Sequence, residues 1–169
     1  LGIYGDAHLA LGALVERLQE RTDRRWTAHG SELRRAWRAE VEPRSSALTK
    51  PIAVERLCRE LTRILPEDAM LVADTGYSGV WTGTLVDLNH ESQGFMRAAG
   101  SLGWALPAAI GAQCALPDRP VVCFCGDGGF YYHLSELETA RRWRIPVTVI
   151  INNNSAFGQD IEGVRKVYG

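Results

Sequence analysis

The chain has 169 residues, of which 46% are hydrophobic and 23% charged, a composition typical of a folded globular protein. The net charge of −1 gives no electrostatic basis for binding nucleic acid or an anionic membrane surface. No apolar run approaches the ~20 residues that span a bilayer. From the net charge and the lack of such a run, we expect neither nucleic acid nor a membrane among the partners. The four cysteines form no CxxC pattern and are expected to be buried, reduced thiols of a cytoplasmic protein.

The N-terminal part predicts one amphipathic helix followed by a polar linker. Asp6 is the expected N-cap of a helix over residues 7–18, whose apolar face is formed by four regularly spaced side chains, Leu11, Leu14, Val15 and Leu18. Residues 23–46 are rich in Arg, Glu and Ser, which indicates an exposed helical linker. We interpret residues 1–46 as the tail of a preceding domain, with its last strand and helix, plus this linker.

Residues 47–169 predict a separate α/β domain. Apolar, β-branched runs that alternate with helical segments are typical of a doubly wound parallel sheet with helices on both faces. The expected strands and helices are, in chain order, a helix over 51–65 with Pro51 in its first turn, a strand over 70–73, a helix over 79–85, an irregular segment over 86–94, a helix over 98–114, a strand over 121–125, a helix over 135–143 and a strand over 147–151.

Two of these strands end in polar residues that we expect to lie side by side. The first leads into Gly126-Asp127-Gly128-Gly129 and the second into Asn152-Asn153-Asn154. Asp127 and Asn154 are 154 − 127 = 27 positions apart, the length of one strand-helix-strand crossover of ~30 residues. The connection therefore brings a carboxylate and an amide to one edge of the sheet.

The residue types at that edge predict a metal ion bound to a phosphate. Mg²⁺ prefers oxygen ligands, which Asp127, Asn154 and the backbone carbonyl of Ala156 can supply. Gly128 and Gly129 allow backbone N–H groups to approach a diphosphate at a helix N-terminus.

Three blocks of the chain resemble thiamine-diphosphate-dependent enzymes. The Gly-Asp-Gly that contains Asp127, followed by Asn153-Asn154, is similar to the family's signature. The segments 74–81 and 100–111 look like two further blocks of the acetolactate synthase and benzoylformate decarboxylase group. The resemblance covers roughly residues 50–158 and identifies the chain as a fragment of that family. It implies a truncated thiamine-diphosphate-binding fold at 47–169, incomplete at its C-terminus.

The resemblance implies thiamine diphosphate and Mg²⁺ as cofactors, with Asp127, Asn154 and Ala156 as the metal ligands. The Gly100 carbonyl would meet the aminopyrimidine, and Leu102 would support the bent shape of the cofactor. The cofactor-binding residues that it implies are Tyr77, Ser78, Gly100, Ser101, Leu102, Asp127, Gly128, Gly129, Asn154, Ala156 and Phe157. Without the resemblance, two of these residues have another predicted role. Leu102 could pack in the core, and Ser78 could be the N-cap of a helix.

The implied activity is that of an acetolactate-synthase-like carboligase, which decarboxylates a 2-oxo acid and transfers the acyl unit to a second carbonyl. A non-oxidative decarboxylase is the alternative, so the enzyme is a transferase or a lyase. Tyr77-Ser78 stand where acetolactate synthases commonly have an amide and an imidazole, which weakens the carboligase assignment. A non-catalytic binding or assembly module that kept the fold is a hypothesis of another class. A phosphoester-handling domain with Asp127 as nucleophile is disfavoured by the Asn154 spacing.

No catalytic residue is assigned in this stretch. The resemblance implies that the glutamate that protonates the cofactor's pyrimidine lies in an N-terminal domain, so this chain alone is expected to be inactive. The determinants of the acyl acceptor and of any FAD requirement lie mainly outside this stretch. The full-length protein is expected to be a homodimer or homotetramer, because in the family the cofactor lies between two subunits.

Overall fold

The computed structural model describes residues 2–20 and 22–169, with only the backbone of Glu162. The chain forms two compact units, residues 1–40 and 41–169. In the first unit, helix α1 (Ala7–Arg17) begins as predicted, because Asp6 Oδ1 accepts the backbone N–H of Leu9 at 2.9 Å. The predicted strand before it is wrong, since residues 2–6 adopt no regular structure and have no strand beside them to pair with.

Helix α2 (Arg25–Ser45) confirms the prediction of an exposed helix, because none of its described residues is buried, and its role as a linker stays a prediction. Near its C-terminal end, Glu42 and Arg44 form ion pairs of 2.8 and 2.9 Å with Arg59 and Glu55 of helix α3 (Val54–Ile64). These ion pairs lie within the second unit, which includes the last residues of α2 from Val41 onward. The assignment of residues 1–46 to a preceding domain stays a prediction.

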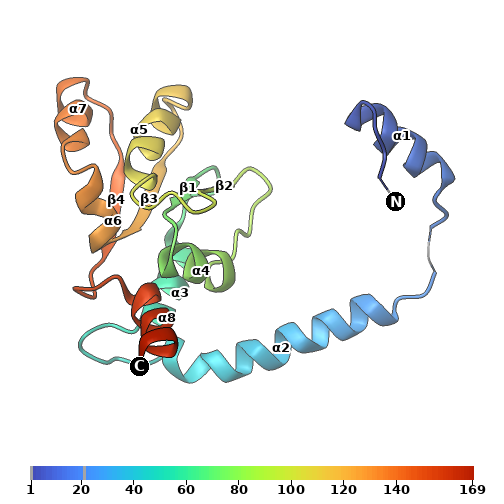
Figure 1. Ribbon diagram of the computed structural model, residues 1–169, viewed down its shortest axis with the longest axis horizontal. Helices are drawn as coiled ribbons and strands as arrows, with labels where there is room; N and C mark the ends of the chain where they lie inside the picture. The colour runs from blue at the N-terminus through green and yellow to red at the C-terminus, as the bar shows by residue number, and fades with distance from the viewer. Residues whose placement is uncertain (1, 21) are drawn as a thin grey trace. The chain divides into compact units, whose positions relative to one another are not determined.

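The second unit contains a parallel sheet, which confirms the predicted fold class. Its strands are β1 (Met70–Ala73), β2 (Gly94–Arg97), β3 (Val121–Gly126) and β4 (Thr148–Asn152), in the order β2-β1-β3-β4 (Figure 1). Every pairing is parallel, so the carboxyl ends of all four strands lie at the same edge.

Helices cover both faces of this sheet because successive residues of β3 point to opposite sides. Val121, Cys123 and Cys125 form one core with apolar residues of α5 (Ala105–Ala115) and α7 (Glu136–Arg142). Val122 and Phe124 form the other core with residues of α3, beside which lies α4 (Tyr77–Leu85) (Figure 1). Both faces of β3 are buried, as expected for the centre of a doubly wound sheet.

Strand β2 was not predicted. It falls at the end of the segment 86–94 and just beyond it, in a stretch that was expected to be irregular or unassigned. Its sequence has only two consecutive apolar residues, Phe95 and Met96, and both are exposed, so β2 lacks the longer apolar run that marks β1, β3 and β4 in the sequence.

Two helices begin later than the sequence predicts. Helix α3 begins at Val54, after Pro51 instead of around it. Helix α5 begins at Ala105, since Gly100 and Gly103 have φ values of 126° and 85°, which a helix does not allow. Pro107 consequently lies in the first turn of α5, where its missing N–H has no intrahelical partner to lose.

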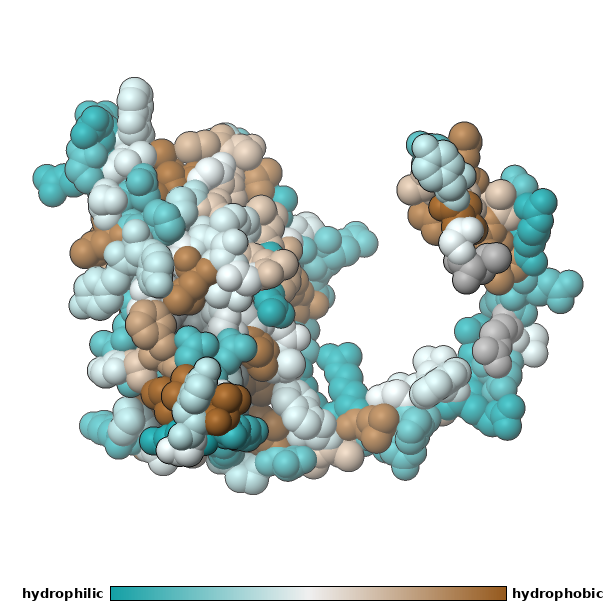
Figure 2. Space-filling view, viewed as in Figure 1, coloured by the Kyte–Doolittle hydropathy of each residue, from teal (hydrophilic) through white to brown (hydrophobic). Residues whose placement is uncertain are grey.

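Two further helices complete the unit. Helix α6 (Asp127–Tyr132) follows β3 directly, and helix α8 (Gly158–Tyr168) follows the asparagine run. Figure 2 shows apolar side chains gathered over α8, where Ile161, Val164 and Val167 are exposed. No helix in the described part of the chain is long and apolar enough to cross a membrane.

The cysteines follow the prediction of buried thiols with one exception. Cys58, Cys123 and Cys125 are buried, but Cys114 is exposed because it lies on the outer side of α5. Burial raises the pKa of Cys58 to about 12, and Glu55 adds to the effect. Hydrogen bonding to Cys125, with burial, raises the pKa of Cys123.

We expect only Cys114 to react rapidly with a maleimide at pH 7.5, because the reagent attacks an accessible thiolate. Intact-protein mass spectrometry should therefore find one fast addition among the cysteines of this chain, and Cys114→Ser should remove it. A second fast addition on this chain in the native state would show that the core around Cys58 or Cys123 opens readily.

We expect Leu61→Ala to lower the free energy of unfolding by about 2–5 kcal/mol, because this α3 side chain is 3% exposed and packs on Phe124 and Leu71 in one core. Ile64→Ala on the same helix is the matched control, since Ile64 is 72% exposed and its loss should cost less than ~1 kcal/mol. Urea denaturation compares the two. Equal losses would contradict the assigned inner face of α3.

Candidate functional site

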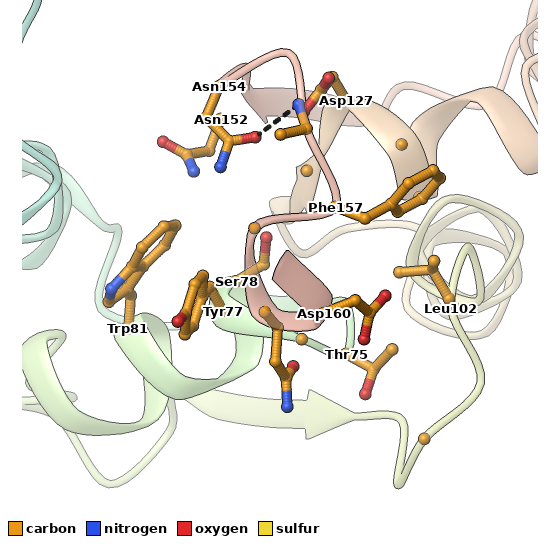
Figure 3. A pocket seen from close by; sticks show the side chains of 18 residues that line it. Thr75, Tyr77, Ser78, Trp81, Leu102, Asp127, Asn152, Asn154, Phe157 and Asp160 are labelled. Atoms are coloured by element: carbon orange, nitrogen blue, oxygen red, sulfur yellow. Dashed lines mark hydrogen bonds between the residues drawn. The ribbon is translucent and has the colours of Figure 1, made fainter. Parts of the chain in front are cut away.

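A pocket of about 360 Å³ lies at the carboxyl edge of the sheet, and every strand contributes a loop to it (Figure 3). Residues 75–78 follow β1, Gly100 and Leu102 follow β2, residues 126–129 follow β3, and residues between Asn152 and Asp160 follow β4. In the order β2-β1-β3-β4 the chain changes direction between β1 and β3. Doubly wound sheets bind their ligands outside the strand ends at such a point.

The pairing of β3 with β4 brings the two predicted metal-binding side chains together. Gly126 pairs with Asn152, so Asp127 and Asn154 follow neighbouring strand ends and both line the pocket. Figure 3 shows their side chains on the same side of the pocket. The juxtaposition that was predicted from the crossover length is therefore confirmed.

Asp127, the first residue of α6, carries a buried oxygen without a partner. Within the described structure, Oδ1 of Asp127 is inaccessible to solvent and has no hydrogen bond. A buried carboxylate oxygen in that state costs folding free energy unless a cation or a donor occupies its free side. Asp127 lines the pocket, so a ligand bound there is the candidate partner of this oxygen.

The asparagine run forms a tight turn that holds Asn154 at the pocket. Asn153 Oδ1 accepts the backbone N–H of Ser155 at 2.9 Å, and Asn154 Oδ1 accepts the N–H of Ala156 at 3.2 Å (dashed line in Figure 3). Ser155 has a left-handed φ of 54°, which lets the chain reverse there. An amide oxygen has two lone pairs, so Asn154 retains one acceptor site after this bond.

These groups fit the metal ion that the sequence predicts. Asp127, Asn154 and Ala156 all line the pocket, and a carboxylate, an amide oxygen and a backbone carbonyl are ligands of the kind that Mg²⁺ accepts. The unpartnered Oδ1 of Asp127 is the observation that favours a cation. Their roles as metal ligands remain a prediction.

Glycine is required at positions 128 and 129 by the surrounding protein. A Cβ at Gly128 would overlap the ring of Phe157, and one at Gly129 would overlap the carboxylate of Asp74. A Cβ at Gly126, by contrast, would only meet Ser78 Oγ at 3.6 Å. Tight packing behind the loop therefore explains these two glycines, in addition to the predicted approach of a phosphate.

Asp74 is a residue of the site region that the sequence analysis left unassigned. It is 1% exposed, and it accepts the backbone N–H groups of Thr75 at 2.8 Å and Gly103 at 3.0 Å. Burial raises the pKa of the Asp74 carboxyl, while these hydrogen bonds and the nearby His133 oppose the rise. The signal in the sequence was an acidic residue placed directly after the buried strand β1.

The alternatives for two predicted residues do not hold. Ser78 is the second residue of α4, whose N-cap is Gly76, so it is not a capping residue. Leu102 belongs to neither core cluster, is half-buried and lines the pocket. Ser101 is exposed and is not among the described lining residues, so its predicted contact with the cofactor finds no support in the pocket.

The pocket also includes residues that the sequence analysis did not select. Tyr77, a predicted residue, stacks on Trp81 with ring centroids 5.2 Å apart. The lining residues that were missed follow the strand ends or begin helices: Thr75, Gly76, Trp81, Gly126, Asn152, Gly158, Gln159 and Asp160. Gly76, Gly126 and Gly158 directly adjoin predicted residues, whereas Gln159 and Asp160 belong to α8, which was not predicted.

The pocket contains negative side chains and no positive ones. Asp127 and Asp160 contribute carboxylates, and no Lys, Arg or His occurs among the lining residues that the structure describes. Backbone N–H groups at the start of α4 are the favourable electrostatic elements for an anion. A highly charged anion would therefore need a cation bound with it.

Comparison with known proteins assigns this region to a described family. Residues 74–160 match the family model of the C-terminal thiamine pyrophosphate (thiamine diphosphate) binding domain of thiamine pyrophosphate enzymes. This range contains all the lining residues of the pocket.

Individual relatives match more of the chain. YdaP of Bacillus subtilis (strain 168), whose name describes a thiamine pyrophosphate-containing protein, is 32% identical over 99% of this chain and 29% of its own length. Acetolactate synthase isozyme 1 large subunit of Escherichia coli (strain K12) is 29% identical over 94% of this chain and 28% of its own. Benzoylformate decarboxylase of Pseudomonas aeruginosa is 34% identical over 70% and 23%. The chain thus spans less than a third of the length of these relatives.

We expect Asp127→Ala in the full-length protein to abolish the rise in melting temperature that Mg²⁺ with thiamine diphosphate produces in the wild type. The ligand-free variant should melt no lower than the wild type, because the substitution removes an unpaired buried oxygen. Differential scanning fluorimetry with and without the ligands measures both effects.

Asp118→Ala is the matched control, since Asp118 is an exposed carboxylate in the turn before β3, outside the pocket. It should keep the full ligand-induced rise. A normal rise in the Asp127 variant would exclude the assigned metal ligand.

Proposed function

We propose that this chain, which belongs to the family of thiamine-diphosphate-dependent enzymes, holds the diphosphate and metal ion of the cofactor in a protein that acts on a 2-oxo acid. The observation that carries the proposal is the unpartnered Asp127 oxygen beside Asn154, at the switch point of the sheet. The cofactor supplies an electron sink for decarboxylation when bound, and the protein supplies binding and orientation.

Mg²⁺ is proposed as the second cofactor on electrostatic grounds. A diphosphate brings several negative charges into a pocket that already contains the carboxylates of Asp127 and Asp160. In the absence of a cationic lining side chain in the described structure, a divalent ion held by Asp127, Asn154 and the Ala156 carbonyl offsets this repulsion. Cofactor binding should accordingly depend on the metal.

Further lining residues are assigned to the diphosphate and to the organic part of the cofactor. Leu102 projects into the pocket from the loop after β2, and Ser78 faces Gly126 from the start of α4 (Figure 3). In the proposed arrangement Ser78 and the glycine loop contact the diphosphate, Leu102 supports the bent cofactor, and the Gly100 carbonyl meets the aminopyrimidine. The Phe157 ring packs against Gly128 and closes one side of the loop.

For the reaction we favour carboligation slightly over simple decarboxylation. Relatives with both kinds of name match the chain, acetolactate synthases over 94% of it and benzoylformate decarboxylase over 70%. The more extensive match favours acyl transfer to a second carbonyl, whereas Tyr77-Ser78 in place of an amide and imidazole pair weakens that assignment. A non-catalytic module that retained the fold is the alternative of another class.

The full-length protein supplies the rest of the active site in this proposal. The glutamate that protonates the pyrimidine comes from an N-terminal domain, and a homodimer or homotetramer brings that domain to the pocket. We propose a cytoplasmic protein, in keeping with its unpaired cysteines.

We expect the full-length protein with pyruvate, thiamine diphosphate and Mg²⁺ to release CO₂ and form acetolactate, which gas evolution and a product assay detect. Acetaldehyde in place of acetolactate would assign a decarboxylase instead. Removing Mg²⁺ with EDTA should abolish turnover, and Asp127→Ala should lower it by at least roughly 100-fold, because even outer-shell ligand changes can cost 10–100-fold.

Benzoylformate and longer 2-oxo acids serve as the comparison substrates. Asp118→Ala should leave turnover unchanged, because that carboxylate lies outside the pocket. A full-length protein that binds the cofactor but forms no product from any 2-oxo acid would favour the non-catalytic alternative.

A further inference from the structure

One buried carboxylate touches three of the loops that form the pocket. Asp74 continues β1, and its backbone N–H donates to the carbonyl of Phe124 in β3 at 2.9 Å, so its position is fixed by the sheet. From there its side chain accepts N–H groups from Thr75 in the loop after β1 and from Gly103 in the loop after β2. Its Oδ2 also occupies the space behind Gly129, in the loop after β3.

The loop after β2 depends on such an attachment more than the other two. It contains Gly100 and Gly103 in left-handed conformations and lies between the end of β2 and the start of α5. Two hydrogen bonds that tie it to the rest of the domain meet at Gly103, whose N–H donates to Asp74 and whose carbonyl lies 2.9 Å from His133 Nδ1. Regular secondary structure does not hold residues 98–104 in place.

Glycine at 103 is required by the same contacts. A Cβ there would lie 2.6 Å from Cβ of Tyr132 and 3.0 Å from the carbonyl oxygen of Gly129. The loop after β2 is thus pressed directly against α6, which begins with Asp127. Leu102 takes part in this packing, because its Cδ1 lies 3.4 Å from the point where a Cβ on Gly129 would stand.

We propose that Asp74 is a positioning residue that fixes the loop carrying Gly100 and Leu102 against the glycine loop, and so sets the spacing between the two ends of the cofactor site. This inference rests on the proposed function, because it assigns the two loops to the two ends of thiamine diphosphate. The Asp74 carboxylate is buried behind Gly129 and Leu102 and acts through them, without contact with the ligand.

The proposal makes a differential prediction that a purely stabilising role does not make. Inorganic pyrophosphate engages only the diphosphate end, at Asp127 and residues 126–129. These residues contact Asp74 only at Gly129, and the paired ends of β3 and β4 and helix α6 also hold them in place. In the proposed arrangement thiamine diphosphate also contacts Leu102 and Gly100, so it requires the correct spacing between their loop and the glycine loop. Loss of the Asp74 side chain should therefore weaken thiamine diphosphate much more than pyrophosphate.

Isothermal titration calorimetry of the full-length protein with Mg²⁺ tests this with both ligands. For Asp74→Ala we expect the Kd of thiamine diphosphate to rise roughly tenfold or more, because the N–H groups of Thr75 and Gly103 lose their acceptor. The Kd of pyrophosphate should change by less than about threefold. Asp74→Asn keeps one acceptor oxygen and nearly the same shape, so it serves if the alanine variant does not fold. It should show the same selectivity with a smaller change.

Leu61→Ala is the control for destabilisation alone, because Leu61 is buried in the core but does not line the pocket. Well below its melting temperature it should bind both ligands like the wild type. Asp74 variants that bind both ligands normally, or lose both in equal measure, would overturn the inference while leaving the proposed function intact. A wild-type protein that fails to bind thiamine diphosphate would instead refute the proposed function, and this inference with it.

Discussion

The parallel register of β1, β3 and β4 is the constraint on which the site depends. Gly126 pairs with Asn152, so β3 and β4 end at the same level of the sheet, and β1 ends two residues earlier, where Ala73 pairs with Phe124. Successive side chains of β3 enter two different cores, which constrains this register, because a slip of one residue would exchange the two sets of side chains. Core packing and the juxtaposition of Asp127 with Asn154 therefore have the same origin.

The charges and hydrogen-bonding groups of the pocket favour the binding of a cation. A buried Asp127 oxygen has no partner in the described structure, and a second carboxylate at Asp160 shares the pocket. An unsatisfied buried acceptor costs about 1–3 kcal/mol, which a bound cation would recover. Asp74 shows the opposite arrangement, since backbone N–H groups surround its buried carboxylate. The Asp74 carboxylate thus forms hydrogen bonds within the protein, whereas the Asp127 carboxylate has an oxygen that a ligand can pair with.

The elements that sequence could predict are those with local signals. Apolar runs in the sequence marked β1, β3 and β4, and the length of one crossover was enough to place Asp127 beside Asn154. Strand β2 escaped prediction because its sequence has only two consecutive apolar residues, Phe95 and Met96. The start of α5 and the need for glycine at 129 depend on tertiary contacts, the packing of Gly103 against α6 and of Asp74 behind the glycine loop. These contacts join segments that are far apart in the sequence, so no local sequence pattern predicts them.

The most direct test of the central claim is a crystal structure of the full-length protein with thiamine diphosphate and Mn²⁺, which replaces Mg²⁺ and gives an anomalous signal. The account predicts one Mn²⁺ peak within roughly 2.0–2.3 Å of Asp127 Oδ1, with Asn154 Oδ1 and the Ala156 carbonyl completing the protein ligands. The diphosphate should lie against Gly128 and Gly129. A peak bound by other residues, or a cofactor located away from the edge formed by β1 and β3, would contradict it.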